Sequence, residues 1–166
     1  YIKRKKIEIE RDVDELTQIY NRNGLKIKIN KLLEDKNIAQ YALIFIDLDD
    51  LKQVNDVYGH YCGDLYLKQM TNVLKTISGE KCLVGRLGGD EFIAFFHHYD
   101  SMEKLNNDIN QLNEIRDQIV LLADDHSVNL AFSYGVCYGT EGTDLQRMIE
   151  IADYKMYENK RKRKGR

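Results

Sequence analysis

The sequence predicts a single α/β domain, in which buried strands alternate with amphipathic helices. Its 166 residues match the length of one ordinary globular domain. Apolar residues make up 43% of the chain and charged residues 31%, as in folded proteins rather than disordered ones. Short apolar runs typical of strands alternate with longer segments of helical periodicity, and no proline-rich or glycine-rich linker divides them.

The first half of the chain predicts a helical stem, a helix, a buried strand and a second helix. Residues 1–16 carry apolar side chains at seven-residue spacing (Ile2, Ile9 and Leu16), which indicates a short helical stem. Helical patterning resumes over residues 24–35. Residues 41–47 are apolar on both faces and end in an acid, as in a strand inside a sheet. Over residues 63–78 the apolar positions follow one helical face.

The second half predicts a hairpin, a long helix, a strand and a final helix. Two short strands, residues 83–87 and 91–96, flank Gly88-Gly89-Asp90, and this pattern is typical of a hairpin. The remaining elements are an amphipathic helix over residues 102–123, a strand over 128–138 and a helix over 145–162.

Charge and hydropathy exclude two classes of protein. Residues 12–159 carry 14 basic and 25 acidic side chains. Because phosphate contacts need concentrated positive charge, we expect no nucleic-acid partner. No apolar run is long enough to cross a bilayer, so we expect a cytoplasmic domain, with membrane attachment of a longer protein left open. The three cysteines lack zinc-site spacing and are expected to be reduced thiols.

Two acidic clusters follow predicted strands. Asp47 ends the strand over residues 41–47, and Asp90 and Glu91 occupy the hairpin turn, where their like charges repel unless a cation relieves them. If the strand end and the hairpin lie side by side, the three carboxylates and the Leu48 carbonyl converge. Such oxygen ligands suit Mg²⁺ or Mn²⁺ and could hold two metal ions for phosphoryl transfer. For the strand end alone, solvated helix-capping aspartates are the simpler alternative.

Five motifs occur in the order and spacing of one known family. With the family's own pattern in parentheses, they are residues 14–22 (DxLTxLxNR), residues 47–67 (DxDxFKxxNDxxGHxxGDxxL), Arg86 with Gly88-Gly89-Asp90-Glu91-Phe92, residues 133–137 (SxGxA) and residues 152–160 (ADxAMYxAK). Over about residues 12–162 the chain therefore resembles the GGDEF domains, which are diguanylate cyclases. Leu51 replaces the usual Phe, and the basic tail departs from the usual KxxGRN, which leaves Lys164 or Arg166 for the second basic role.

The resemblance implies an α+β sandwich, with a palm-like, mostly antiparallel central sheet flanked by helices, as in nucleotide cyclases. It divides the chain into a helical stem over residues 1–13, a GGDEF catalytic domain over 14–162 and a basic tail over 163–166. We expect condensation of two GTP into cyclic di-GMP with release of two pyrophosphates. Since each domain binds one GTP, the resemblance implies a homodimer, and the stem implies a sensory or regulatory domain upstream of this sequence.

The resemblance also assigns roles to the acids. Asp47, the Leu48 carbonyl, Asp90 and Glu91 are the expected metal ligands, with Mg²⁺ or Mn²⁺ as the cofactor. Asp90 is expected to accept the proton of the attacking ribose 3′-hydroxyl, and Glu91 is the alternative acceptor.

A second group of residues is expected to bind GTP. Asp64 can accept two hydrogen bonds from the guanine N1–H and N2–H₂ groups, a donor pair that adenine lacks. Without the motif, Asp64 would simply cap the following helix, and Lys160 would belong to the basic tail. The remaining expected contacts are Lys52 and Lys160 on the triphosphate, Asn55 and His60 at the base, and Gly88 and Gly89 at the turn.

Two other functions fit the same motifs. One is a non-catalytic GTP-binding regulatory module, although all the signature carboxylates are present here. The other is a palm cyclase with a different nucleotide product, although Asp64 disfavours an adenine nucleotide.

Overall fold

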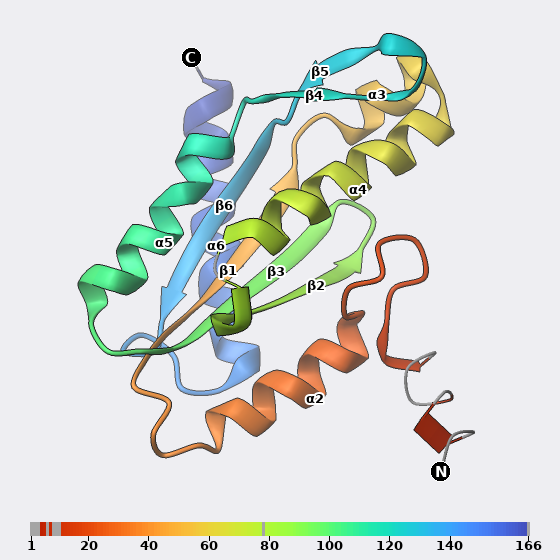
Figure 1. The fold of residues 1–166 in the computed structure, drawn as a ribbon. Coiled ribbons are helices and arrows are strands. Elements are labelled where there is room, and N and C mark those ends of the chain that lie inside the picture. The colour runs from red at the N-terminus through yellow and green to blue at the C-terminus, as the bar shows by residue number, and fades with distance from the viewer. Residues whose placement is uncertain (1–3, 6, 8–10, 78, 166) are drawn as a thin grey trace.

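The computed structural model describes residues 4, 5, 7, 11–77 and 79–165. Figure 1 shows the fold, and its element labels are kept here. In chain order the elements are α2 (Arg22–Leu33), β1 (Gln40–Leu48), α3 (Leu51–Tyr58), α4 (His60–Ile77), η1 (Gly79–Lys81), β2 (Cys82–Gly88), β3 (Glu91–Tyr99), α5 (Met102–Ile115), β4 (Ile119–Leu121), η2 (Ala123–Asp125), β5 (Ser127–Asn129), β6 (Phe132–Tyr138) and α6 (Leu145–Lys164).

The central sheet is antiparallel at every pairing, in the strand order β2-β3-β1-β6. β4 and β5 form a separate two-stranded hairpin. In the middle of the large sheet, Asp47 of β1 lies opposite Glu91 of β3 and Ser133 of β6. This α+β architecture with an antiparallel central sheet confirms the predicted fold class.

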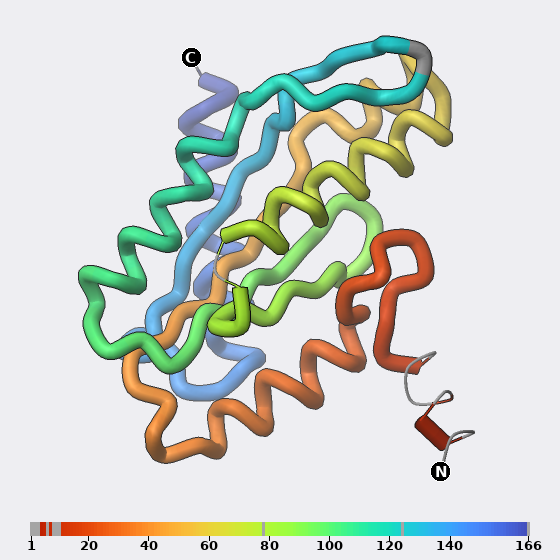
Figure 2. Tube along the Cα trace, viewed as in Figure 1, coloured from red at the N-terminus to blue at the C-terminus, as the bar shows by residue number. Residues whose placement is uncertain are grey.

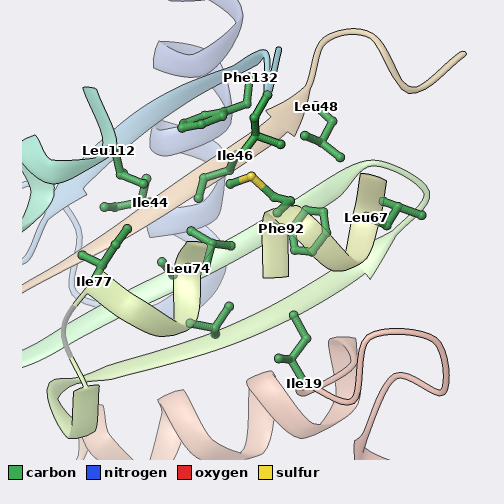
Figure 3. Close-up of a cluster of buried hydrophobic side chains, with 14 of the residues drawn as sticks. Ile19, Ile44, Ile46, Leu48, Leu67, Leu74, Ile77, Phe92, Leu112 and Phe132 are labelled. Carbon is green, nitrogen blue, oxygen red and sulfur yellow. The ribbon is translucent and has the colours of Figure 1, made fainter. Parts of the chain in front are cut away.

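Helices cover both faces of the sheet. Helices α4 and α5 lie on one face, and α2 and α6 lie on the other (Figures 1 and 2). Each face has its own buried cluster, and the residues of the α4/α5 face surround Ile44 and Ile46 (Figure 3). Leu43 and Phe45 belong to the opposite cluster, next to α2 and α6. Because side chains alternate along a strand, Asp47 continues the face that α6 covers.

The structure differs from the sequence prediction in four elements. The helix expected over residues 102–123 ends at Ile115, because Arg116 is extended (ψ 137°) and Asp117 has a φ of 67°. The end of the expected helix forms strand β4 instead. The strand expected over 128–138 is two strands, β5 and β6. Helix α3 was not predicted, and α6 extends to Lys164, into the expected basic tail.

The expected helical stem and the expected absence of a membrane span concern the ends and the helices of the chain. Of the three expected stem positions, Ile2 and Ile9 lie outside the described residues, and Leu16 lies in a turn, not in the expected helix. No helix among the described residues is long and apolar enough to span a membrane.

Close packing of α6 on β6 yields a test of the fold. A methyl group at Gly135 would overlap the Ala152 carbonyl oxygen and the Met156 backbone nitrogen, and backbone atoms of a packed helix cannot move aside. We expect Gly135→Ala to lower the free energy of unfolding by about 1–3 kcal/mol, measured by urea denaturation. At Gly165 the nearest such atom would be 3.5 Å away, so Gly165→Ala is the matched control and should change stability little. Equal stabilities of the two variants would contradict this packing.

Candidate active site

The predicted acids meet at one end of the sheet. Antiparallel pairing sets Asp47 opposite Glu91, while Asp90 lies in the two-residue turn between β2 and β3. The Leu48 amide donates a hydrogen bond to the Asp90 backbone oxygen at 3.0 Å, which joins the turn to the end of β1. The Asp90 carboxylate lies close enough to Asp47 to raise the pKa of the Asp47 carboxyl. The structure thus brings these acids together as the sequence predicted.

The Asp47 carboxyl lies in an unfavourable electrostatic position. Its pKa is raised to about 6, mainly because the group is buried; the Lys160 ammonium opposes this rise, and the Asp90 carboxylate adds to it. Asp47 Oδ1 is buried and has no hydrogen-bond partner among the described residues. The pKa of Glu91 is also raised, by burial and then by Asp90 and Asp153, with Arg22 opposing. A buried carboxylate oxygen without a partner is costly, so this group of acids favours a nearby cation.

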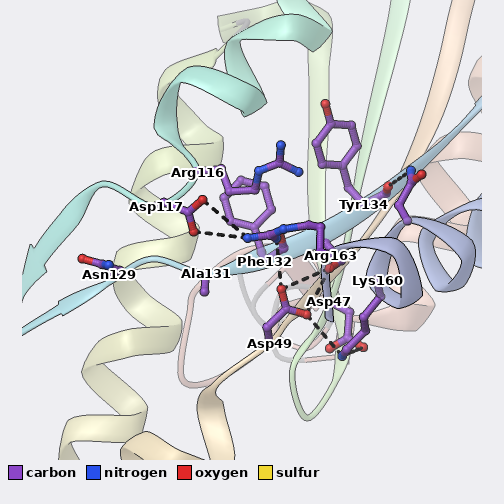
Figure 4. A network of polar contacts seen from close by, with 12 residues as sticks. Asp47, Asp49, Arg116, Asp117, Asn129, Ala131, Phe132, Tyr134, Lys160 and Arg163 are labelled. Carbon is purple, nitrogen blue, oxygen red and sulfur yellow. Dashed lines mark hydrogen bonds and ion pairs between the residues drawn. The ribbon is translucent and has the colours of Figure 1, made fainter. Parts of the chain in front are cut away.

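Two basic side chains of α6 contact Asp47 and the nearby Asp49 (Figure 4). Lys160 Nζ lies 2.9 Å from Asp47 Oδ2 and 3.4 Å from Asp49 Oδ1. One turn further along α6, Arg163 Nη1 donates to Asp49 Oδ2 at 3.1 Å and to the Phe132 carbonyl oxygen. Side chains three residues apart share a helix face, so both cations face the same end of the sheet.

Asp49 and Arg163 are two site residues that the sequence prediction did not include. Asp49 lies two positions after Asp47, on the same side of the extended chain, and this spacing was the available signal. Between the two candidates for the second basic role, Lys164 is exposed and Arg166 lies outside the described residues. Arg163 instead contacts the acids, because α6 continues through the expected tail.

The signature turn is held by an arginine. Gly88 and Gly89 have φ of 142° and 52°, conformations that side chains disfavour. Arg86 donates from Nε and Nη2 to the Gly89 carbonyl oxygen, at 3.0 and 2.8 Å, and from Nη1 to Asp14 at 3.3 Å. Asp14 also accepts hydrogen bonds from the Thr17 amide and hydroxyl. The segment before α2 therefore fixes the hairpin, through residues that the sequence analysis placed in motifs but not in the site.

The predicted base-binding residues lie on α3 and α4. A methyl group at Gly63 would overlap Asn55 Oδ1, so the glycine lets the Asn55 amide lie directly against α4. Asp64 follows on α4 and is exposed, as are Lys52 near the start of α3 and His60 at the start of α4. Within the described residues, no hydrogen bond or ion pair joins these last three side chains to the acids. Their roles in binding GTP stay predictions.

The donor set resembles the kind that Mg²⁺ uses with a phosphorylated substrate. Mg²⁺ usually binds one or two carboxylates and takes its other ligands from substrate phosphates and water. In the described part of the chain, no three Asp, Glu, His or Cys side chains form a ready metal cage. The unpartnered Asp47 oxygen and the neighbouring Asp90 carboxylate nevertheless fit a divalent cation, since both favour positive charge between them.

A family comparison agrees with this geometry. The sequence model described as "Diguanylate cyclase, GGDEF domain" matches residues 11–166. This chain belongs to the GGDEF family. It is 30% identical over 151 residues to diguanylate cyclase DgcN of Escherichia coli K12, and the match covers 90% of this chain and 37% of DgcN. It is 33% identical over 156 residues to DgcP of the same strain, covering 89% and 44%. It therefore spans less than half the length of these two curated relatives.

Solved structures of GGDEF proteins have the same fold. A sensory box/GGDEF family protein from Caulobacter crescentus superimposes with a TM-score of 0.82 at 28% identity, covering 91% of this chain and 99% of that one. The GGDEF domain of TpbB (YfiN) from Pseudomonas aeruginosa gives a TM-score of 0.83 at 28% identity, covering 90% and 89%.

The contact between Arg86 and Asp14 predicts a pH-dependent contribution to stability. Burial alone would raise the pKa of Asp14, but hydrogen bonds from Thr17 and the charge of Arg86 outweigh it and hold the pKa below its usual value. A carboxyl whose pKa is lower in the folded protein than in the unfolded one stabilises the fold at pH values above its unfolded-state pKa. This contribution is lost as the pH falls through the folded-state pKa. We expect Asp14→Asn to lower the free energy of unfolding by about 1 kcal/mol at neutral pH.

Urea denaturation between pH 7 and about pH 3 measures this effect. The difference between Asp14→Asn and the unmodified protein should shrink toward the acid end, as the Asp14 carboxyl begins to take up a proton. Asp125→Asn changes an exposed aspartate of η2 and serves as the control. A difference in stability that stays constant across the pH range would show that the Asp14 charge contributes nothing.

Proposed function

We propose that this GGDEF domain is a diguanylate cyclase, which condenses two GTP into cyclic di-GMP and releases two pyrophosphates. The observation that carries the proposal is the meeting of Asp47, Asp90 and Glu91 beside the Lys160 ammonium, with one Asp47 oxygen that has no partner among the described residues. This arrangement suits a reaction in which negative charge on phosphate must be neutralised. Membership of a family whose named relatives are diguanylate cyclases supports the choice of reaction.

The proposed metal ligands are Asp47, the Leu48 carbonyl, Asp90 and Glu91. When bound there, Mg²⁺ or Mn²⁺ would supply Lewis-acid stabilisation of phosphate charge. The protein itself holds these acids close together despite their repulsion, because strand pairing fixes Asp47 opposite Glu91.

Protein side chains take the other roles in the proposed reaction. The ribose 3′-oxygen of one GTP forms a bond to the α-phosphorus of the GTP on the partner domain, and pyrophosphate leaves. Asp90 accepts the 3′-hydroxyl proton, and Glu91 is the alternative, since burial and neighbouring acids raise its pKa and make it a stronger base. Lys52 and Lys160 neutralise the triphosphate. A homodimer is needed, because each domain holds a single GTP.

Base selection is assigned to α3 and α4. The exposed Asp64 carboxylate would accept hydrogen bonds from the guanine N1–H and N2–H₂ groups, with Asn55 and His60 beside the base. The Gly88-Gly89 turn would let the backbone approach the substrate closely, since neither residue carries a side chain.

The central test is the Asp90→Asn variant. Incubating each protein with GTP and Mg²⁺ and resolving the products by chromatography should show cyclic di-GMP for the unmodified domain. We expect Asp90→Asn to reduce synthesis at least a hundredfold, because it removes one metal-binding charge and one proton acceptor. Thermal stability should not fall, since the Asp90 backbone contact to Leu48 remains and one repelling charge is removed.

The same assay distinguishes the alternative functions. Product formed per chain should rise with protein concentration, as expected for two domains that must meet. GTP binding without any product would identify a regulatory module, and a different cyclic nucleotide would identify another palm cyclase. Near-normal turnover by Asp90→Asn would refute the metal and base assignments.

A second variant tests base selection. Asp64→Ser replaces a double hydrogen-bond acceptor by a small neutral hydroxyl, and we expect it to weaken GTP binding by about 1.5–3 kcal/mol. A competition assay between GTP and ATP should then show a reduced preference for GTP. The control Glu114→Ser removes the same charge from the exposed surface of α5. An unchanged preference for GTP in Asp64→Ser would assign base selection to other residues.

A further inference from the structure

A polar pocket lies at the β6 edge of the sheet, next to the candidate active site, because Arg163 lines this pocket and also contacts Asp49. It has a volume of about 480 Å³, within the range of small-ligand sites. Its walls come from the end of α5, from β6 and from the last turns of α6, and Figure 4 shows this region around Arg116, Tyr134 and Arg163. None of the residues proposed above to bind GTP or metal lines it.

The pocket is positively charged within a domain whose body is acidic. Three of its lining side chains are basic, namely Arg116, Lys162 and Arg163, and one is acidic, Asp117. Arg163 Nη2 lies 3.2 Å from Asp117 Oδ1, so this acid is paired with a single cation. No described residue forms an ion pair with Lys162. The lining residues sum to +2, and Arg163 is also paired with Asp49 outside the lining, so the positive charge available to a ligand comes from Arg116 and Lys162 and suits a phosphate-bearing anion.

Arg116 is held in a fixed orientation. Its guanidinium lies over the Tyr134 ring, 5.7 Å from the ring centre, and donates one hydrogen bond to Asn113 Oδ1 at 3.1 Å. A guanidinium has five N–H donors, and its planar fork matches phosphate oxygens. Stacking on an aromatic ring limits the side-chain freedom that binding would otherwise have to remove.

Two amides add neutral groups to the wall. Asn113 Oδ1 accepts hydrogen bonds from the Tyr134 hydroxyl at 2.8 Å and from Arg116. This use of its oxygen fixes which way the amide points, and the described residues provide no acceptor for Asn113 Nδ2. Asn159 Nδ2 donates to the Tyr134 backbone oxygen at 2.9 Å, which ties α6 to β6 beside the pocket.

We propose that this pocket binds a phosphate-bearing dianion. The guanidinium of Arg116, the ammonium of Lys162 and the amide of Asn113 supply the donors, and the net charge of the lining matches that of the ligand. The anion is either a free phosphate or pyrophosphate, or the phosphate group of a nucleotide. This proposal does not depend on the proposed cyclase activity, since binding here uses none of the residues assigned to that reaction.

Isothermal titration calorimetry in metal-free buffer tests the site, with inorganic phosphate, pyrophosphate and GMP as probes. Omitting divalent ions excludes metal-mediated binding at the acids. We expect the unmodified protein to bind at least one probe, and the double variant Arg116→Gln/Lys162→Gln to bind it at least tenfold more weakly. Asp117→Asn removes the one acid of the lining and should strengthen binding severalfold.

Two variants act as controls. Arg161→Gln removes a neighbouring basic residue of α6 that does not line the pocket, and Lys36→Gln removes an exposed basic residue of the turn between α2 and β1. Both should bind the probe as the unmodified protein does. GMP binding that is tighter than that of the inorganic anions and is lost in Arg116→Gln/Lys162→Gln would identify a nucleotide as the ligand of this pocket, and the reverse order would identify a free anion. No binding, or equal loss in Arg161→Gln or Lys36→Gln, would overturn the proposal.

Discussion

Repulsion between carboxylates is the constraint around which this domain is organised. Pairing of β1 with β3 forces Asp47 opposite Glu91 and beside Asp90, although burial makes each charge costly. The fold compensates with the Lys160 ammonium, carried by a helix that packs on the same face of the sheet. The acids are thus prepared to receive positive charge, because the protein neutralises them only in part.

The geometry of the site depends on segments that are distant in sequence. Arg86 connects the Gly89 carbonyl to Asp14, so the segment before α2 restrains the hairpin that carries Asp90. Asp49, in turn, accepts hydrogen bonds from Ser133 at the start of β6 and from Arg163 of α6. A polar network that joins so many elements is rigid only when all of its members are satisfied.

The sequence predicted those features that have strong local signals. Strand β1 was recognisable because it is apolar on both faces, and the Gly88-Gly89 turn was recognisable because few other residues tolerate its backbone conformation. The end of α5 could not be predicted, because the apolar spacing continues past Ile115 and the left-handed Asp117 depends on tertiary contacts. Arg163 was missed because one basic residue in a run cannot be distinguished from its neighbours until the helix phase is known.

The pairing of Lys160 with Asp47 also bears on how the domain folds. These residues are separated by 113 positions, so the contact closes one of the longest loops in the chain. Closing a loop of this length costs entropy, which the other contacts of α6 must offset. Those contacts are close in sequence, since α6 packs on β6, the preceding strand. Packing of α6 on the sheet therefore couples the burial of its apolar face to neutralisation of the acids.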